Sequence, residues 1–154
     1  MHVVDPTLRI LLVEDDEDDY ILTRELIREF RWSMPLLEWE SDFARALDAM
    51  VAGSYDVYLL DYRLGPHSGL DLLQAAVEKG CKAPIILLTG QGDHEVDLQA
   101  MEAGAADYLV KGSLKAPALE RAIRYAIQQR RMMAELAETR AKAQGMLRAL
   151  EGST

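Results

Sequence analysis

Five polar residues follow apolar runs at four separate places in the chain. Glu14 and Asp15 follow the first run, Asp61 follows another, and Thr89 and Lys111 follow two more. If these runs are parallel strands of one sheet, their carboxyl ends meet at the edge where open α/β sheets bind ligands. The three carboxylates would repel one another there unless a cation neutralised them. Without a histidine or cysteine cluster, the ligands are oxygens, which suit a hard cation such as Mg²⁺.

This set of groups fits phosphoryl transfer to a carboxylate. Asp61, held beside Mg²⁺, is a nucleophile of the kind that forms aspartyl phosphates. Mg²⁺ and the Lys111 ammonium would neutralise charge on the transferring group, and the Thr89 hydroxyl would donate a hydrogen bond to it. Each residue has a structural alternative, such as a helix cap, a turn cap or a surface lysine. Their joint occurrence at four strand ends favours the functional interpretation.

Five strand-like runs alternate with helical patterns along the chain. The strand-like runs are 8–13, 36–40, 56–60, 84–88 and 107–110. Repeated strand–helix–strand units predict a mostly parallel sheet with helices on both faces, and the order 2-1-3-4-5 is the simplest doubly wound arrangement. In the helix from about residue 93, we expect Val96, Leu98, Met101 and Ala105 on the core side. Residues 61–67 are expected to form a loop.

Length and composition indicate one globular domain in a reducing compartment. The chain has 154 residues, a single cysteine and a net charge of -9. It has no apolar stretch of roughly 20 residues that could span a bilayer, and its first residues lack the features of a signal peptide. We therefore expect a cytoplasmic protein that does not enter membranes. Its negative charge repels phosphate backbones, so we expect no nucleic-acid binding by this chain alone.

Four motifs of the chain resemble those of receiver domains in two-component response regulators. They are V-E-D at 13–15, L-L-D-Y-R-L-G at 59–65, L-L-T-G at 87–90 and Y-L-V-K at 108–111. The resemblance covers about 8–128, so we assign 1–128 to a receiver domain with a flavodoxin-like fold. It implies that Asp61 accepts a phosphoryl group from a histidine kinase or phosphotransfer protein. Such a domain assists its own phosphorylation and dephosphorylation and is not an enzyme with a separate substrate.

The resemblance also implies a set of magnesium ligands. Asp15 and Asp61 would bind Mg²⁺ directly, Glu14 would hold a water ligand of the metal, and the backbone carbonyl of Arg63 would complete the protein ligands. The additional acid Asp16 leaves two registers for the first pair, Glu14/Asp15 or Asp15/Asp16. The continuity of the first strand into Glu14 favours the former pair.

Two further features concern the switch that reports phosphorylation. By resemblance, the Thr89 hydroxyl moves toward the phosphoryl group while the Tyr108 ring turns inward. The chain departs from the family at Gly112, where a proline usually follows the lysine. A glycine disfavours a cis peptide bond and loosens the start of the last helix. The chemistry of Lys111 is unaffected by this departure.

The last helical pattern continues from Pro117 to about Leu150, beyond the end of a receiver domain. Apolar and small residues alternate by three and four positions, as in a coiled coil. The seam consists of Leu119, Ala122, Ala126, Gln129, Met133, Leu136, Arg140, Ala143, Leu147 and Leu150. We expect residues 129–154 to form a helical extension that pairs in a parallel homodimer. A solvated single helix is the alternative, because Gln129, Arg140 and Gly145 weaken the seam.

Two other functions compete with the receiver interpretation. A metal-dependent phosphatase with an aspartyl nucleophile on the first strand needs Asp-x-Asp followed by Thr or Val. The segment 16–20, D-E-D-D-Y, lacks that residue, and a phosphatase would leave Asp61 without a role. A dimerisation adaptor that is never phosphorylated would not require the complete set of side chains that this chain carries.

Overall fold

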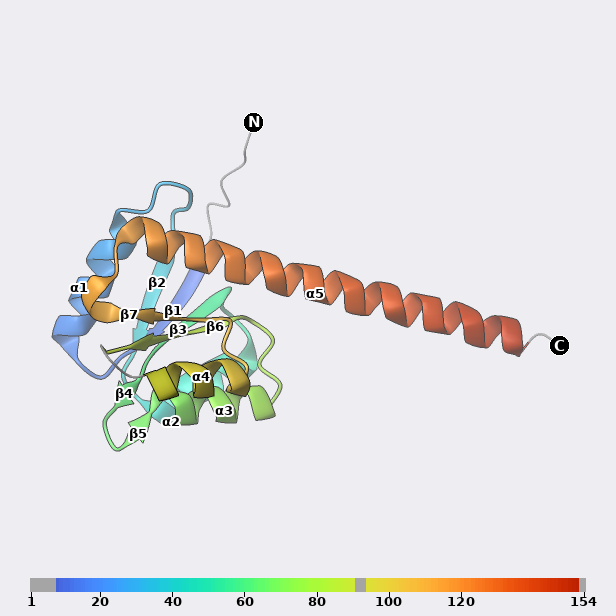
Figure 1. Cartoon of the computed structure of the whole chain (residues 1–154), viewed down its shortest axis with the longest axis horizontal. Coiled ribbons are helices and arrows are strands. Elements are labelled where there is room, and N and C mark those ends of the chain that lie inside the picture. Colours follow the sequence, from blue (N-terminus) through green and yellow to red (C-terminus); the bar gives the residue numbers. More distant parts are fainter. Residues whose placement is uncertain (1–7, 91–93, 153–154) are drawn as a thin grey trace.

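The chain folds around a sheet of five parallel strands, which the computed structural model describes together with the rest of residues 8–90 and 94–152 (Figure 1). The strands are β1 (Arg9–Val13), β2 (Leu36–Glu40), β3 (Val57–Asp61), β6 (Ile85–Thr89) and β7 (Asp107–Val110). Their order is β2-β1-β3-β6-β7, and each adjacent pair is parallel. Counted along the five strands this is 2-1-3-4-5, so the predicted doubly wound sheet is confirmed.

Helices cover both faces of the sheet and divide the core into two clusters (Figure 1). One face carries α1 (Glu17–Arg28) and α5 (Ala116–Glu151), and the other carries α2 (Phe43–Ala52), α3 (Gly69–Glu78) and α4 (His94–Ala103). Every residue of β3 and β6 is buried, as expected for strands covered on both faces. These two central strands end at Asp61 and Thr89, so the core fixes the positions of both residues.

Side-chain caps set the points at which helices leave the sheet edge. The Asp16 carboxylate accepts a hydrogen bond from the backbone N–H of Asp18 at the start of α1. Ser68 and Asp71 form a reciprocal capping box at the start of α3, which satisfies two backbone donors of the first turn. Because of these caps, α1 and α3 each begin close to the end of the strand that precedes them.

The prediction of which α4 residues face the core is wrong in part. Val96, Ala100 and Ala105 are buried, whereas Leu98 is 66% exposed and Met101 is 46% exposed. Residues four apart lie on the same face of a helix, so Val96 and Ala100 share the face on the sheet and Leu98 lies on the other side. The small Ala100 side chain lies in the interface, and the more hydrophobic Leu98 and Met101 do not.

The segment expected as a loop after β3 contains a small hairpin. The short strands β4 (Arg63–Leu64) and β5 (His67–Ser68) pair in antiparallel fashion, and the Leu64 side chain of β4 is buried. Gly65 adopts a φ of 61° in the connecting turn, a backbone conformation that glycine reaches without steric cost. The hairpin therefore gives this segment a fixed shape beside Asp61.

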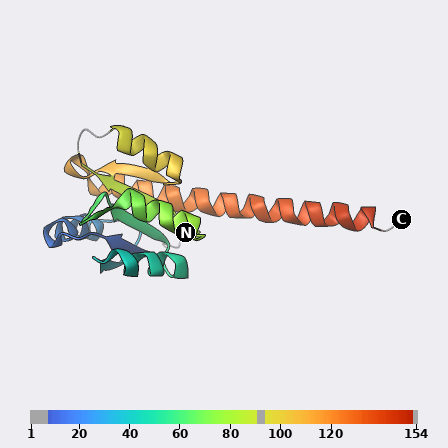
Figure 2. The same cartoon turned by 90° about the horizontal axis from the view of Figure 1, so that it is seen from below.

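The last helix is much longer than the others. α5 spans 36 residues without interruption and extends away from the domain as a single rod (Figure 2). Leu119, Ala122 and Ala126 are buried in the core, so the first three seam positions are already used within one copy of the chain. From 131 to 152, every residue is exposed. Pairing of this segment with a second copy stays a prediction.

Among the described residues, no helix is both long and apolar enough to cross a membrane.

Candidate functional site

The topology brings four of the predicted residues to one edge of the sheet. Asp61 is the last residue of β3 and Thr89 is the last residue of β6, while Glu14 directly follows β1 and Lys111 directly follows β7. The parallel pairing of β1 with β3, β3 with β6 and β6 with β7 places these ends side by side. Residues separated by up to 97 positions in sequence thus face one site.

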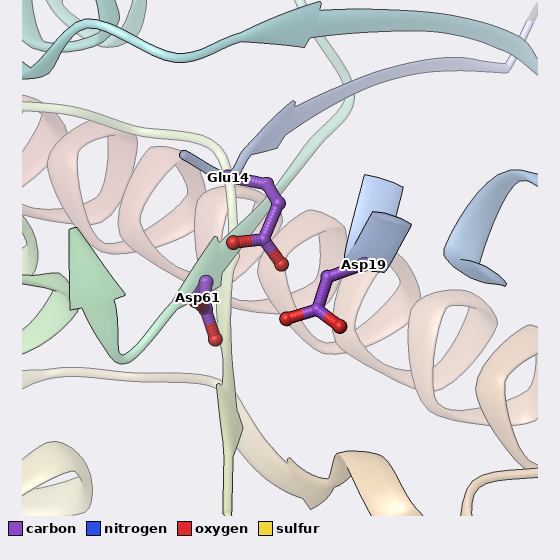
Figure 3. A group of neighbouring side chains, drawn as sticks. All are labelled: Glu14, Asp19 and Asp61. Atoms are coloured by element: carbon purple, nitrogen blue, oxygen red, sulfur yellow. The ribbon is translucent and has the colours of Figure 1, made fainter. Parts of the chain in front are cut away.

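Three carboxylates surround the ammonium group of Lys111. Its Nζ lies 3.1 Å from Asp61 Oδ1, 3.0 Å from Glu14 Oε1 and 2.7 Å from Asp19 Oδ2. Figure 3 shows the three carboxylates pointing toward a common space from β1, β3 and the first turn of α1. One oxygen of each lies within 4.8 Å of the others, close enough to hold a metal ion. Asp19 is a member of this group that the sequence did not reveal.

Burial changes the acid–base properties of the site. Glu14 is fully buried, and desolvation together with the hydrogen bond to Asp61 raises its pKa to about 8, although Lys111 opposes the shift. Burial alone would lower the pKa of Lys111, but hydrogen bonds to Asp19 and Glu14 and the charge of Asp61 outweigh it. They hold the pKa of Lys111 above its ordinary value, so the lysine remains a cation at neutral pH.

Asp19 and Asp61 open onto a cavity of about 450 Å³ at the sheet edge. It is lined by Asp15, Asp16, Asp19, Asp61, Tyr62, Arg63, Thr89, Gly90, Val96 and Lys111. The Asp15 carboxylate is exposed, and its Oδ2 accepts a hydrogen bond from the backbone N–H of Gly65 at 2.8 Å. Asp15 therefore ties the end of β1 to the hairpin and lies outside the group of three. Asp16 also lines the cavity, but its carboxylate caps α1.

The predicted switch residues lie on the neighbouring strands β6 and β7, where Thr89 pairs with Val110 and Tyr108 pairs with Leu87. Thr89 is buried, and its hydroxyl donates a hydrogen bond of 3.4 Å to the backbone carbonyl of Leu109. Tyr108, the residue before Leu109, is 37% exposed. A short 3₁₀ turn from Lys111 to Ser113 follows, and no peptide bond among the described residues is cis. The expectation of a trans bond before Gly112 is thus confirmed.

An aromatic pair supports the backbone of Glu14. The indole N–H of Trp39 donates to the Glu14 carbonyl at 2.6 Å. The Trp39 ring stacks on Tyr20, with 4.3 Å between ring centroids and 6° between ring planes. Tyr20 directly follows Asp19, so this contact links the backbone positions of two carboxylates in the site. The sequence carries no spacing signal for such a pair.

The donor set fits a hard divalent cation. Glu14, Asp19 and Asp61 offer carboxylate oxygens that already converge on one cation, the Lys111 ammonium. Asp15 and Arg63 line the same cavity and add further oxygen atoms. Oxygen-only sites of this kind favour Mg²⁺ over softer metals.

The family model of the response regulator receiver domain matches residues 10–124. The chain belongs to this family. It is therefore a receiver domain of the two-component response regulator type, with the flavodoxin-like fold described above and an extended last helix.

Relatives and solved structures agree with this assignment. The response regulator protein PmrA of Pseudomonas aeruginosa is 35% identical over 105 residues, which cover 68% of this chain and 46% of that protein. The response regulator RppA of Synechocystis sp. is 31% identical over 116 residues, or 74% of this chain and 48% of that protein. The chain thus spans about half the length of these relatives. A receiver domain from Clostridium thermocellum superposes with a TM-score of 0.67 at 28% identity, covering 81% of this chain and 98% of the other.

Proposed function

We propose that this receiver domain accepts a phosphoryl group on Asp61 from a histidine kinase or phosphotransfer protein, in a step that requires Mg²⁺. The observation that carries the proposal is the position of Asp61. Its carboxylate ends a fully buried strand, opens onto a cavity and lies 3.1 Å from the Lys111 ammonium. Such an arrangement suits a carboxylate nucleophile that must receive a highly charged group.

Different residues of the chain have separate roles in phosphoryl transfer. A bond forms between an Asp61 carboxylate oxygen and phosphorus while the bond from phosphorus to the donor breaks, and the donor leaves with that electron pair. The Lys111 ammonium pairs with the incoming phosphoryl oxygens, and the Thr89 hydroxyl exchanges the Leu109 carbonyl for one of them. Bound Mg²⁺ supplies further neutralisation of phosphoryl charge. Asp15, Asp61 and the Arg63 carbonyl would hold it directly and Glu14 through a water molecule.

The buried Thr89 hydroxyl and the exposed Tyr108 ring support a switch between two arrangements. Thr89 is bound to the backbone of β7 directly beside Tyr108. When the hydroxyl turns to the phosphoryl group, it vacates space next to β7, and the Tyr108 ring turns inward to fill it. The change would alter the surface formed by β7 and its neighbours and so alter partner binding.

The expected test is the appearance of a phosphoadduct. After incubation of the protein with acetyl phosphate and Mg²⁺, measurement of the intact mass should show one added phosphoryl group. Asp61→Asn should abolish the adduct, whereas Asp18→Asn, which changes an exposed aspartate at the start of α1, should leave it unchanged. An adduct that persists in Asp61→Asn, or that forms equally well without Mg²⁺, would contradict the proposal.

We propose further that residues 1–128 act as the receiver in the cytoplasm and that residues 129–154 pair with a second copy as a parallel helical stalk. Met133, Leu136, Leu147 and Leu150 are each more than half exposed along the extension, which supports a covering partner. Light scattering should give a dimer whose mass falls to that of a monomer in Leu136→Lys. The exposed Arg131→Lys serves as control. A monomeric wild-type protein, with and without beryllofluoride, would rule out the stalk.

With its net charge of -9, the chain alone is not expected to bind nucleic acid, and its chemistry is confined to its own aspartate.

A further inference from the structure

The Lys111 ammonium lies between the two carboxylates that would lie beside a bound divalent cation. Its ammonium bridges Glu14 and Asp61, the two buried carboxylates of the site, at 3.0 and 3.1 Å. Mg²⁺ bound to Asp61 and close to Glu14 would repel an ammonium group held between them. Entry of the metal therefore requires Lys111 to move away from these two carboxylates, while its ammonium stays available for the phosphoryl group.

We propose that Asp19 is a positioning residue that retains the Lys111 ammonium when Mg²⁺ takes over Glu14 and Asp61. The inference rests on the function proposed above, since it concerns the same site. Asp19 makes the shortest of the three contacts with Lys111, at 2.7 Å. It comes from α1, whereas the other two carboxylates come from strand ends. Lys111 can thus release both strand-end carboxylates without losing every partner.

Burial and local charge suit Asp19 to this role. Its side chain is 34% exposed, against 8% for Asp61 and 0% for Glu14, so it lies at the outer side of the group. It belongs to the first turn of α1, where the helix dipole stabilises a negative charge. An ammonium group that releases the buried pair and keeps its contact with Asp19 lies nearer to solvent. This displacement leaves the inner carboxylates to the metal.

The alternative is that Asp19 attracts Mg²⁺ through its charge or binds it directly. Both roles predict weaker Mg²⁺ binding when Asp19 loses its charge, so a single substitution cannot separate them. They differ in the part played by Lys111. If Asp19 acts by retaining Lys111, its substitution matters only while Lys111 is present. If Asp19 acts on the metal itself, the substitution matters equally without Lys111.

The experiment is a double-mutant cycle on Mg²⁺ affinity, measured by equilibrium dialysis on the wild-type protein, Asp19→Asn, Lys111→Met and the double variant. We expect Asp19→Asn to weaken Mg²⁺ binding about five-fold when Lys111 is present, the scale of a partly exposed ion pair. In the Lys111→Met background the same substitution should change the affinity less than about two-fold. Lys111→Gln provides a second background should the methionine variant fold poorly, and Asp19→Glu should restore the affinity.

Each result distinguishes retention of Lys111 by Asp19 from a direct effect of Asp19 on Mg²⁺. Equal weakening in both backgrounds would overturn the inference in favour of a direct effect on the metal, and unchanged or tighter binding in Asp19→Asn would also overturn it. The neighbouring Asp18→Asn carries the same change of charge at an exposed position and should have little effect. If it weakens binding as much as Asp19→Asn, long-range charge is the cause and the inference fails. Failure of the wild-type protein to bind Mg²⁺ would instead refute the metal dependence proposed for Asp61.

Discussion

Replacing Gly69 with alanine tests how closely α3 is packed against β3, the strand that ends at Asp61. Gly69 is the first residue of α3, and its N–H donates to the Tyr62 carbonyl at 2.7 Å. A Cβ atom at this position would lie 2.2 Å from the carbonyl oxygen of Asp61 and 2.8 Å from Cδ1 of Leu87. The backbone of Gly69 does not have positive φ, so alanine suffers no conformational strain there. Any cost of the substitution is therefore steric.

The size of that cost follows from what the new methyl group meets. An ordinary contact of this kind is at least 3.4 Å, so the Asp61 carbonyl or the start of α3 must move by more than 1 Å. Asp61 lies in a fully buried strand and cannot yield as a flexible side chain would. Overpacking of this kind costs about 1–3 kcal/mol, and the backbone clash places the cost of Gly69→Ala at the upper end of this range, at about 3 kcal/mol. The better helix propensity of alanine offsets less than about 1 kcal/mol of it.

Urea unfolding followed by circular dichroism measures the loss. Gly90→Ala is the matched control, because a Cβ there meets nothing within 4 Å although Gly90 lines the cavity onto which Asp61 opens. The control should lie within about 0.5 kcal/mol of the wild type. The shift of Asp61 should also slow phosphorylation by acetyl phosphate at temperatures where Gly69→Ala is fully folded. A wild-type stability for Gly69→Ala, or an equal loss in Gly90→Ala, would refute the packing argument.

Other features of the structure lead to four further predictions. Glu120 is buried and accepts hydrogen bonds from the backbone N–H groups of Arg31 and Trp32 at 3.1 and 2.9 Å, so Glu120→Ala should cost about 2–3 kcal/mol in urea unfolding. Glu14 has a pKa near 8 when folded and 4.5 in the unfolded chain, so between these values only the folded state holds the proton. Stability of the metal-free protein should fall as pH rises through this window, and not in Glu14→Gln. Because Mg²⁺ needs the ionised Glu14, its affinity should rise over the same range in pH-dependent dialysis. Gly145 lies in the exposed part of α5, and a Cβ there would meet nothing within 4 Å, so Gly145→Ala should stabilise α5 by up to about 1 kcal/mol and increase its helical dichroism.

The fold and four site residues were predictable because both depend on where strands end. Continuous apolar runs identify β3 and β6 as central strands, and a parallel sheet brings their carboxyl ends together. Asp61, Thr89 and Lys111 could therefore be placed at one edge without knowledge of any contact. The same rule places Glu14 there, since it follows β1 directly. The strand order follows from the doubly wound connection of the five strands.

Features that depend on helix rotation and side-chain direction could not be predicted in this way. Asp19 belongs to an acidic run of six residues, and only the cap at Asp16 fixes which of these acids faces Lys111. Leu98 and Met101 are apolar, but the close packing of α4 through Ala100 leaves them exposed. The position of Gly69 against Asp61 results from the start of α3, which the capping box determines. The spacing of Ser68 and Asp71 predicts the cap itself, but no period or spacing predicts the contacts that follow from it.

The site holds three carboxylates close together, and their repulsion links the binding of a cation, the protonation of Glu14 and the position of Lys111. Glu14 and Asp61 are buried, so they cannot turn into solvent, and neutralisation relieves their repulsion. Among the described residues, two groups provide that relief: the Lys111 ammonium, and the proton that Glu14 retains up to a pKa of about 8. Mg²⁺, bound as proposed, would replace both, since it would need an ionised Glu14 and would repel the ammonium. On this proposal, metal binding, proton release from Glu14 and release of the buried carboxylates by Lys111 would be one coupled event. A substitution at any of these residues should alter all three together.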